Sequence, residues 1–144
     1  MTATTLVFPS TRDAMLVAIL AYVVIGVGGA ELAGRAASHG GTVGWRLAAW
    51  VLSLATFIIH IAWLRIRPRG PLASASMQVA ASVAISAFVL AVVGPLRSHW
   101  SQPDVVRVAA LSVILWPVLT GIPAFGAAYV VGRAIDHLTR RHVP

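Results

Sequence analysis

Residues 108–132 read VAALSVILWPVLTGIPAFGAAYVVG and contain no charged side chain. Arg107 and Arg133 bracket this stretch. At about 1.5 Å per residue, a helix of this length crosses a hydrocarbon core of ~30 Å with some tilt. Pro117 and Pro123 lie inside the stretch, and we expect both to break the helix because the proline ring removes an N–H donor. The stretch therefore predicts a broken transmembrane helix.

The composition supports a membrane location for the whole chain. Of its 144 residues, 58% are hydrophobic and only 10% are charged, and the mean hydropathy is +0.85. Soluble domains carry about 25% charged residues, so this chain has too few polar side chains to cover several apolar runs. The net charge of +7 comes from arginines at the ends of these runs, where they anchor helices, and we expect no nucleic-acid partner. The lack of cysteine excludes disulfides, thiolate metal ligands and cysteine nucleophiles.

Three further apolar runs precede residues 108–132 along the chain, at residues 14–34, 47–64 and 73–96. Short polar segments with glycine or proline separate them, and a basic tail follows at 133–144. The first run is longer than the core of a signal peptide, so we expect it to remain as a span. The prediction is an all-α fold, an integral membrane antiparallel four-helix bundle in a single domain, 1–144. Short matches between the two halves leave open whether the helical hairpins arose by duplication.

The distribution of arginine predicts the orientation. Seven arginines lie in the N-terminal tail, the second connection and the C-terminal tail: Arg12, Arg65, Arg67, Arg69, Arg133, Arg140 and Arg141. Four lie in the other two connections: Arg35, Arg46, Arg97 and Arg107. Because cytoplasmic segments carry the excess of positive charge, both termini are expected in the cytoplasm. The use of arginine without lysine, with much alanine and valine, predicts a GC-rich bacterial source and hence the inner membrane.

Small residues on two of the predicted spans indicate close helix packing. Gly26, Ala30 and Gly34 follow one another at four-residue spacing, which lets another helix approach closely. Ser82 and Ser86 lie in the third span, which is rich in serine and alanine. Packing within the chain and a seam between copies are both compatible with this pattern.

Two polar side chains inside the spans are candidates for ligand or proton binding. Glu31 lies near one end of the first span, and His60 lies near the opposite membrane face in the second. At ~1.5 Å per residue their depths differ by roughly 18 Å, so we do not expect them to form a proton-relay pair. Glu31 is expected to pair with an arginine such as Arg35, and His60 to donate a hydrogen bond to a backbone carbonyl, including one freed in the fourth span.

Pro117, Thr120 and Pro123 form the third group of candidates. The prolines free the carbonyls of Val113 and Leu119, and broken helices of this kind line binding sites in transporters. They also occur as simple kinks. His39, His99 and Asp104 have no metal-ligand spacing, so no metal site is expected.

The sequence carries no phosphate-binding loop, nucleophile elbow or zinc-protease motif, and we expect no enzymatic activity, catalytic residue or cofactor. The first hypothesis is a small accessory or packing subunit of the membrane, or a homo-oligomer, with the lipid bilayer as its surroundings. The second is a small proton-coupled transporter or channel that works as an oligomer, with Glu31 as the coupling carboxylate. The third is a subunit associated with haem or quinone.

Overall fold

A computed structural model describes residues 10–66, 71–97 and 103–141 of the chain. It is all-helical over these residues, with α1 at Thr11–Arg35, α2 at His39–Ile66, α3 at Leu72–Arg97 and α4 at Pro103–Arg141. All four helices are long and apolar enough to cross a membrane. The number of helices is therefore the one that the four apolar runs predict.

Local capping explains where the first two helices begin. The Ser10 hydroxyl accepts the N–H of Asp13, and the Asp13 carboxylate accepts the N–H of Ser10, which is a capping box. α2 begins at His39, inside the segment that we expected to be a loop, because the Ser38 hydroxyl accepts the N–H of Gly41. The Thr42 hydroxyl also donates to the carbonyl of Ala33 and joins the ends of the two helices.

α4 continues through Pro117 and Pro123 and ends only at Arg141. The expected breaks at these prolines are therefore absent, and the tail after residue 132 is helical to Arg141. A proline costs a helix one hydrogen bond and a steric contact, but it does not end the helix when neighbouring helices hold the flanking turns in place. α3 supplies that support, since it packs along α4.

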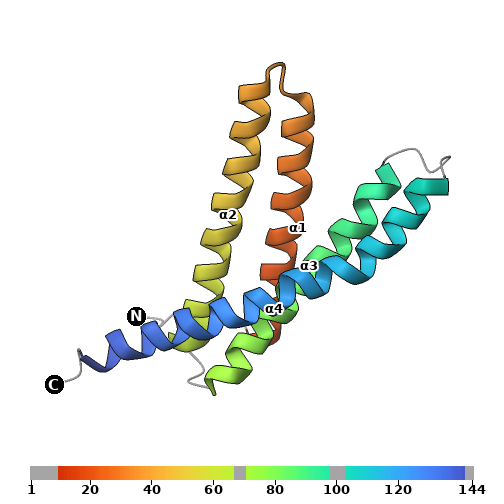
Figure 1. The fold of residues 1–144 in the computed structure, drawn as a ribbon. Helices are drawn as coiled ribbons and strands as arrows, with labels where there is room; N and C mark the ends of the chain where they lie inside the picture. Colours follow the sequence, from red (N-terminus) through yellow and green to blue (C-terminus); the bar gives the residue numbers. More distant parts are fainter. Residues whose placement is uncertain (1–9, 67–70, 98–102, 142–144) are drawn as a thin grey trace, which may run out of the picture.

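The helices form two side-by-side pairs (Figure 1). α2 returns beside α1 after a connection of residues 36–38, and α4 lies beside α3. In Figure 1 the second pair crosses the lower end of the first pair and leans away from it above. α2 and α3 each contact the other three helices, whereas α1 and α4 do not contact each other within the described residues.

Small residues allow the closest helix approaches. A Cβ atom placed on Gly29 would lie 2.6 Å from the Cβ of Ala49, so α1 and α2 touch there nearly backbone to backbone. A Cβ on Gly121 would lie 3.2 Å from the Cβ of Ala84, where α4 meets α3. Such contacts replace the burial of large side chains, as is usual when helices associate in lipid.

The buried core is small and lies at one end of the molecule. It contains Ile61 and Leu64 of α2, Ala75 and Val79 of α3, and Ala128 of α4. Elsewhere most of the apolar side chains face outward, because only between 6% and 28% of each apolar helix window is buried. A surface of this kind is stable when an apolar solvent covers it.

Candidate functional site

A cavity with a volume of about 690 Å³ lies between the two helix pairs. All four helices contribute to its lining, which has no charged side chain among the described residues. We refer to it as the central cavity. Its lining consists of Tyr22, Gly26, Ala49, Trp50, Ser53, Leu54, Phe57, Val83, Ser86, Ala87, Leu90, Ala91, Trp116, Thr120, Pro123, Ala124 and Ala127. A mostly apolar cavity of 300–1,000 Å³ with a few hydroxyl groups is typical of a small-molecule site.

The central cavity lies halfway along the helices. Tyr22 is at the middle of α1 (Thr11–Arg35), and Ser53 is at the middle of α2 (His39–Ile66). Ser86 is likewise near the middle of α3 (Leu72–Arg97). Pro123 and Ala124 are at the middle of the apolar segment Ala110–Thr139 of α4. If the helices cross a bilayer, the cavity lies near its midplane.

Two tryptophans mark the side on which the central cavity is open. Trp50 of α2 is 76% exposed and Trp116 of α4 is 53% exposed, although both line the cavity. Exposed aromatic side chains at the edge of a cavity belong to its rim. Residues on the outer surface of α2 and α4 therefore form part of the rim of the cavity.

The hydroxyl groups of the central cavity differ in their hydrogen bonds. Ser86 donates to the carbonyl of Ser82 at 2.7 Å, and Thr120 donates to the carbonyl of Trp116 at 2.7 Å. The Tyr22 hydroxyl is buried and has no hydrogen-bond partner in the structure. An unpaired buried hydroxyl costs about 1–3 kcal/mol relative to a paired one. Tyr22 therefore carries a buried hydroxyl in the lining whose hydrogen-bonding capacity is unused.

Two of the three candidates in α4 line the central cavity. Pro123 and Thr120 are among its lining residues, whereas Pro117 lies outside it and is half-buried in the helix. Pro123 cannot supply the N–H that the carbonyl of Leu119 would accept in a regular helix. The freed carbonyl and the Thr120 hydroxyl thus lie within one turn of each other on the helix that borders the cavity.

His60 lies in the second span as expected, but its hydrogen bonding differs from the prediction. Both of its ring nitrogens are buried and have no hydrogen-bond partner, so the predicted bond to a backbone carbonyl is absent. The imidazole lines a second cavity of about 340 Å³ between α1 and α2, beside Ala14, Ala18 and Ala21. The freed carbonyls belong to α4, whereas this cavity is lined by α1 and α2, which explains the difference.

Glu31 forms an ion pair with Arg35 one turn later in α1, at 3.3 Å. The Arg35 side chain is exposed, and the pair lies at the end of the helix. Glu31 lies ten residues beyond Ala21, the residue of α1 nearest to it that lines the cavity of His60. At ~1.5 Å per residue this is about 15 Å, so Glu31 and His60 do not form a pair.

The small residues expected to mediate packing have unequal roles. Gly26 packs on α3, where an added Cβ would lie 2.6 Å from the Leu90 side chain. Ser82 and Ser86 are buried, and Ser86 also donates to the carbonyl of Ile19 in α1 at 3.4 Å. Ala30 is exposed, and a Cβ on Gly34 would meet nothing within 4 Å.

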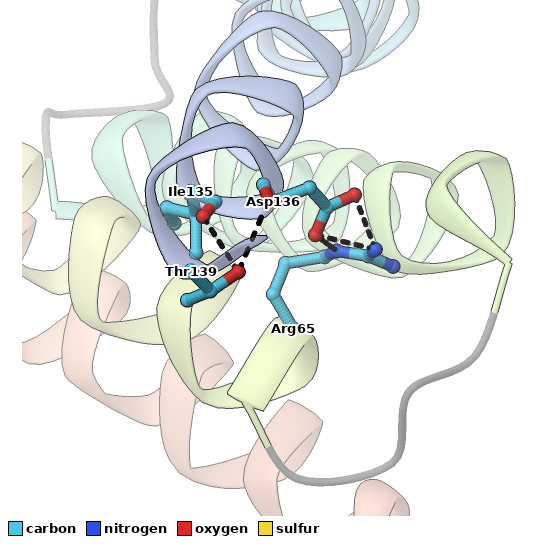
Figure 2. A network of polar contacts seen from close by, with 4 residues as sticks. All are labelled: Arg65, Ile135, Asp136 and Thr139. Carbon is cyan, nitrogen blue, oxygen red and sulfur yellow. Dashed lines mark hydrogen bonds and ion pairs between the residues drawn. The ribbon is translucent and has the colours of Figure 1, made fainter. Parts of the chain in front are cut away.

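Among the described residues, a bidentate ion pair joins α2 to α4 (Figure 2). Arg65 donates from Nε to Oδ1 of Asp136 at 2.9 Å, and from Nη2 to Oδ1 at 2.6 Å and to Oδ2 at 2.5 Å. The two side chains are 11% and 27% exposed. Thr139, one turn on, donates to the carbonyls of Ile135 and Asp136. The pair joins α2 to α4 at the end of the molecule that contains the buried core.

The other arginines used to predict the orientation are less fully described. Arg133 is exposed on α4. Arg67 and Arg69 lie outside the described residues. Arg140 and Arg141 lie in the last turn of α4, but their side chains lie outside what the structure describes.

Sequence reasoning missed two features of the structure. One is Tyr22, whose position at the middle of an apolar span was a usable signal, because tyrosine in membrane helices is enriched at the interfaces. The other is the partnership of Arg65 with Asp136, which no local spacing reveals. No protein-family model, curated protein or solved structure matches this chain.

Proposed function

We propose that the four helices cross a bilayer in antiparallel order, as a bundle with both termini on the cytoplasmic side of a bacterial inner membrane. The outward-facing apolar side chains support this arrangement, because in water they would leave most of each helix surface unfavourably hydrated. The excess of arginine near the termini and in the second connection supports the orientation.

Within this arrangement, the proposed function is the binding of an uncharged, largely apolar small molecule in the central cavity, without catalysis by the chain. The observation that carries the proposal is the cavity itself: about 690 Å³, halfway along all four helices and lined by aromatic and aliphatic side chains. The exposed Trp50 and Trp116 mark a lateral entrance from the lipid. Quinones and other isoprenoid-like molecules belong to this ligand class.

The charge distribution distinguishes this proposal from a proton-coupled exporter that depends on Glu31. A cation in the central cavity would meet no acidic side chain among the described residues, and an unpaired charge is costly in an apolar site. Glu31 is already paired with Arg35 at the end of α1. A neutral ligand avoids both costs.

Binding of Nile red, an uncharged dye with a carbonyl group, tests the proposal. The purified chain in lipid nanodiscs is titrated, with protein-free nanodiscs as the blank. Ala87→Phe fills the cavity from α3 and should weaken saturable binding by about tenfold or more, because the ligand and the new ring compete for space. Ala55→Phe, at an exposed position of α2 outside both cavities, should leave the affinity within about twofold. Equal effects of the two variants, or no saturable binding, would reject the proposal.

Assembly of the chain as a homo-oligomer is the second candidate, and it is compatible with ligand binding. The observation that favours it is the outer face of α1, where Ala30 is exposed and Gly34 has open space around its Cα. Such small residues let a second helix approach closely. Gly34→Leu should convert an oligomer to a monomer by native mass spectrometry in mild detergent. Gly126→Leu, at an equally open glycine of α4, should not. A wild-type chain that is monomeric throughout would reject this candidate.

A further inference from the structure

The smaller cavity, of about 340 Å³, has no lining residue in common with the central cavity. We refer to it as the His60 cavity. Four residues of α1 and four of α2 line it: Ala14, Val17, Ala18, Ala21, Thr56, Ile59, His60 and Trp63. Val17 and Ile59 are exposed, so the cavity is open on the outer side of the first helix pair.

His60 is a buried polar residue in the lining of this cavity whose ring nitrogens lack hydrogen-bond partners. The residue is only 5% exposed, and neither Nδ1 nor Nε2 has a hydrogen-bond partner. A neutral imidazole carries one N–H donor and one bare nitrogen acceptor, so two hydrogen-bonding groups are left unpaired. The neighbouring Thr56 hydroxyl donates to the carbonyl of Leu52 at 2.9 Å and is not a partner of either ring nitrogen. Buried polar groups without partners are rare and indicate a missing partner.

We propose that the His60 cavity binds an uncharged amphiphile, with an apolar body against the alanines and Trp63 and a hydroxyl group hydrogen-bonded to His60. A hydroxyl both donates and accepts, so it pairs with either ring nitrogen in either tautomer once the buried imidazole rotates to turn that nitrogen toward the cavity. A charged ligand does not fit, since no charged side chain lines the cavity.

The size of the His60 cavity sets the size of the ligand. A cavity of about 150 Å³ lined by apolar side chains holds benzene. At about 340 Å³, the His60 cavity has room for one aromatic ring with a short alkyl chain. Phenols and hydroxylated lipid fragments have these dimensions.

The position of the His60 cavity also suits an amphiphile. Ala14 lies in the first turn of α1, and Trp63 lies in the last turn of α2, two residues before Arg65. In the proposed membrane arrangement this level is close to one interface, where a hydroxyl group remains near water and the apolar body stays in lipid. The inference depends on that arrangement but not on ligand binding in the central cavity.

The test compares 4-butylphenol with butylbenzene, which differs from it only by lacking the hydroxyl. With [15N]histidine-labelled protein in nanodiscs, 4-butylphenol should shift the ring signals of one histidine of the five. Those signals should be missing from His60→Phe and present in His39→Phe, a control at an exposed position in the same helix. Butylbenzene should leave the ring signals close to their ligand-free positions.

Calorimetry on the same samples gives the affinities. Loss of one hydrogen bond should lower the affinity of His60→Phe for 4-butylphenol by about 3- to 10-fold, to the level of butylbenzene. His60→Gln retains a donor and an acceptor and should keep most of the preference, which also controls for misfolding of the Phe variant. Equal affinity of the wild type for both compounds would overturn the proposal. So would an unchanged preference in His60→Phe, or a loss of preference in His39→Phe.

Discussion

Arg65 at the end of α2 binds both carboxylate oxygens of Asp136 in α4, 71 positions further along the chain. Both side chains are largely removed from solvent. Because a planar guanidinium and a carboxylate fit each other along two parallel hydrogen bonds, the contact fixes the orientation of the two helices as well as their distance. The ion pair lies beside the small core that includes Ile61, Leu64 and Ala128. It stabilises the packing of α2 and α4 at the end of the molecule where α2, α3 and α4 meet.

Asp136→Asn should lower the free energy of unfolding by about 2 kcal/mol, because it removes the carboxylate charge that stabilises the buried Arg65 guanidinium. Unfolding of the purified chain with increasing SDS in mixed micelles measures this change. Glu31→Gln is the matched control, since it removes the acid of an ion pair whose arginine is exposed. It should cost about 0.5 kcal/mol or less. Equal losses in the two variants would contradict the structural role of the Arg65–Asp136 pair.

The adjacent glycines of α1 provide a test of helix packing. Gly29→Ala places a Cβ atom 2.6 Å from that of Ala49, and neither atom can move without its backbone. The substitution should therefore destabilise the chain by about 1–3 kcal/mol. Gly28→Ala meets nothing within 4 Å and should be neutral or stabilise the helix by up to about 1 kcal/mol. The same SDS titration applies to both variants.

The clash at Gly29 can also be relieved from the other helix. Adding Ala49→Gly to Gly29→Ala removes the opposing Cβ atom and should restore part of the lost stability. If the double variant is as unstable as the sum of the two single variants, α1 and α2 do not pack as described.

Removing the Tyr22 hydroxyl should affect stability and binding in opposite directions. Tyr22→Phe deletes a buried hydroxyl that has no partner, so the free energy of unfolding without ligand should rise by about 1 kcal/mol. The affinity for Nile red should fall by about 3- to 10-fold, because the donor to its carbonyl is lost. Tyr129→Phe, at a tyrosine that stacks on Phe125 outside the cavity, should change neither quantity. Lower stability of the Tyr22→Phe variant would mean that the hydroxyl has a partner.

The length and apolarity of the four runs were sufficient to predict the four helices. A helix that crosses lipid must satisfy its own backbone, so its signal is continuous in the sequence and needs no distant partner. The ends of the helices were harder to predict. His39 to Arg46 is glycine-rich and polar, yet it is helical, because Ser38 caps it and Thr42 bonds back to α1. These contacts outweigh the low helix propensity of glycine.

The site could be predicted only in part. Thr120 and Pro123 were identified because a proline inside an apolar run is a local signal, and both line the central cavity. The partner of Asp136 in the structure is Arg65, 71 positions away along the chain, and no local spacing predicts this pair. Which helix faces meet is decided by contacts far apart in the sequence, so the cavities and the isolation of His60 could not be derived from periodicity alone.

The claim on which the account depends is that the four helices cross a bilayer in alternating directions. Since the chain contains no cysteine, single-cysteine variants report this directly. In intact cells, a membrane-impermeant maleimide should label Ala37→Cys, between α1 and α2. It should label Ser10→Cys, before α1, and Thr139→Cys, near the end of α4, only after the membrane is permeabilised. Labelling of Ala37→Cys and Ser10→Cys from the same side would contradict the alternating arrangement and, with it, the location of both cavities in the membrane.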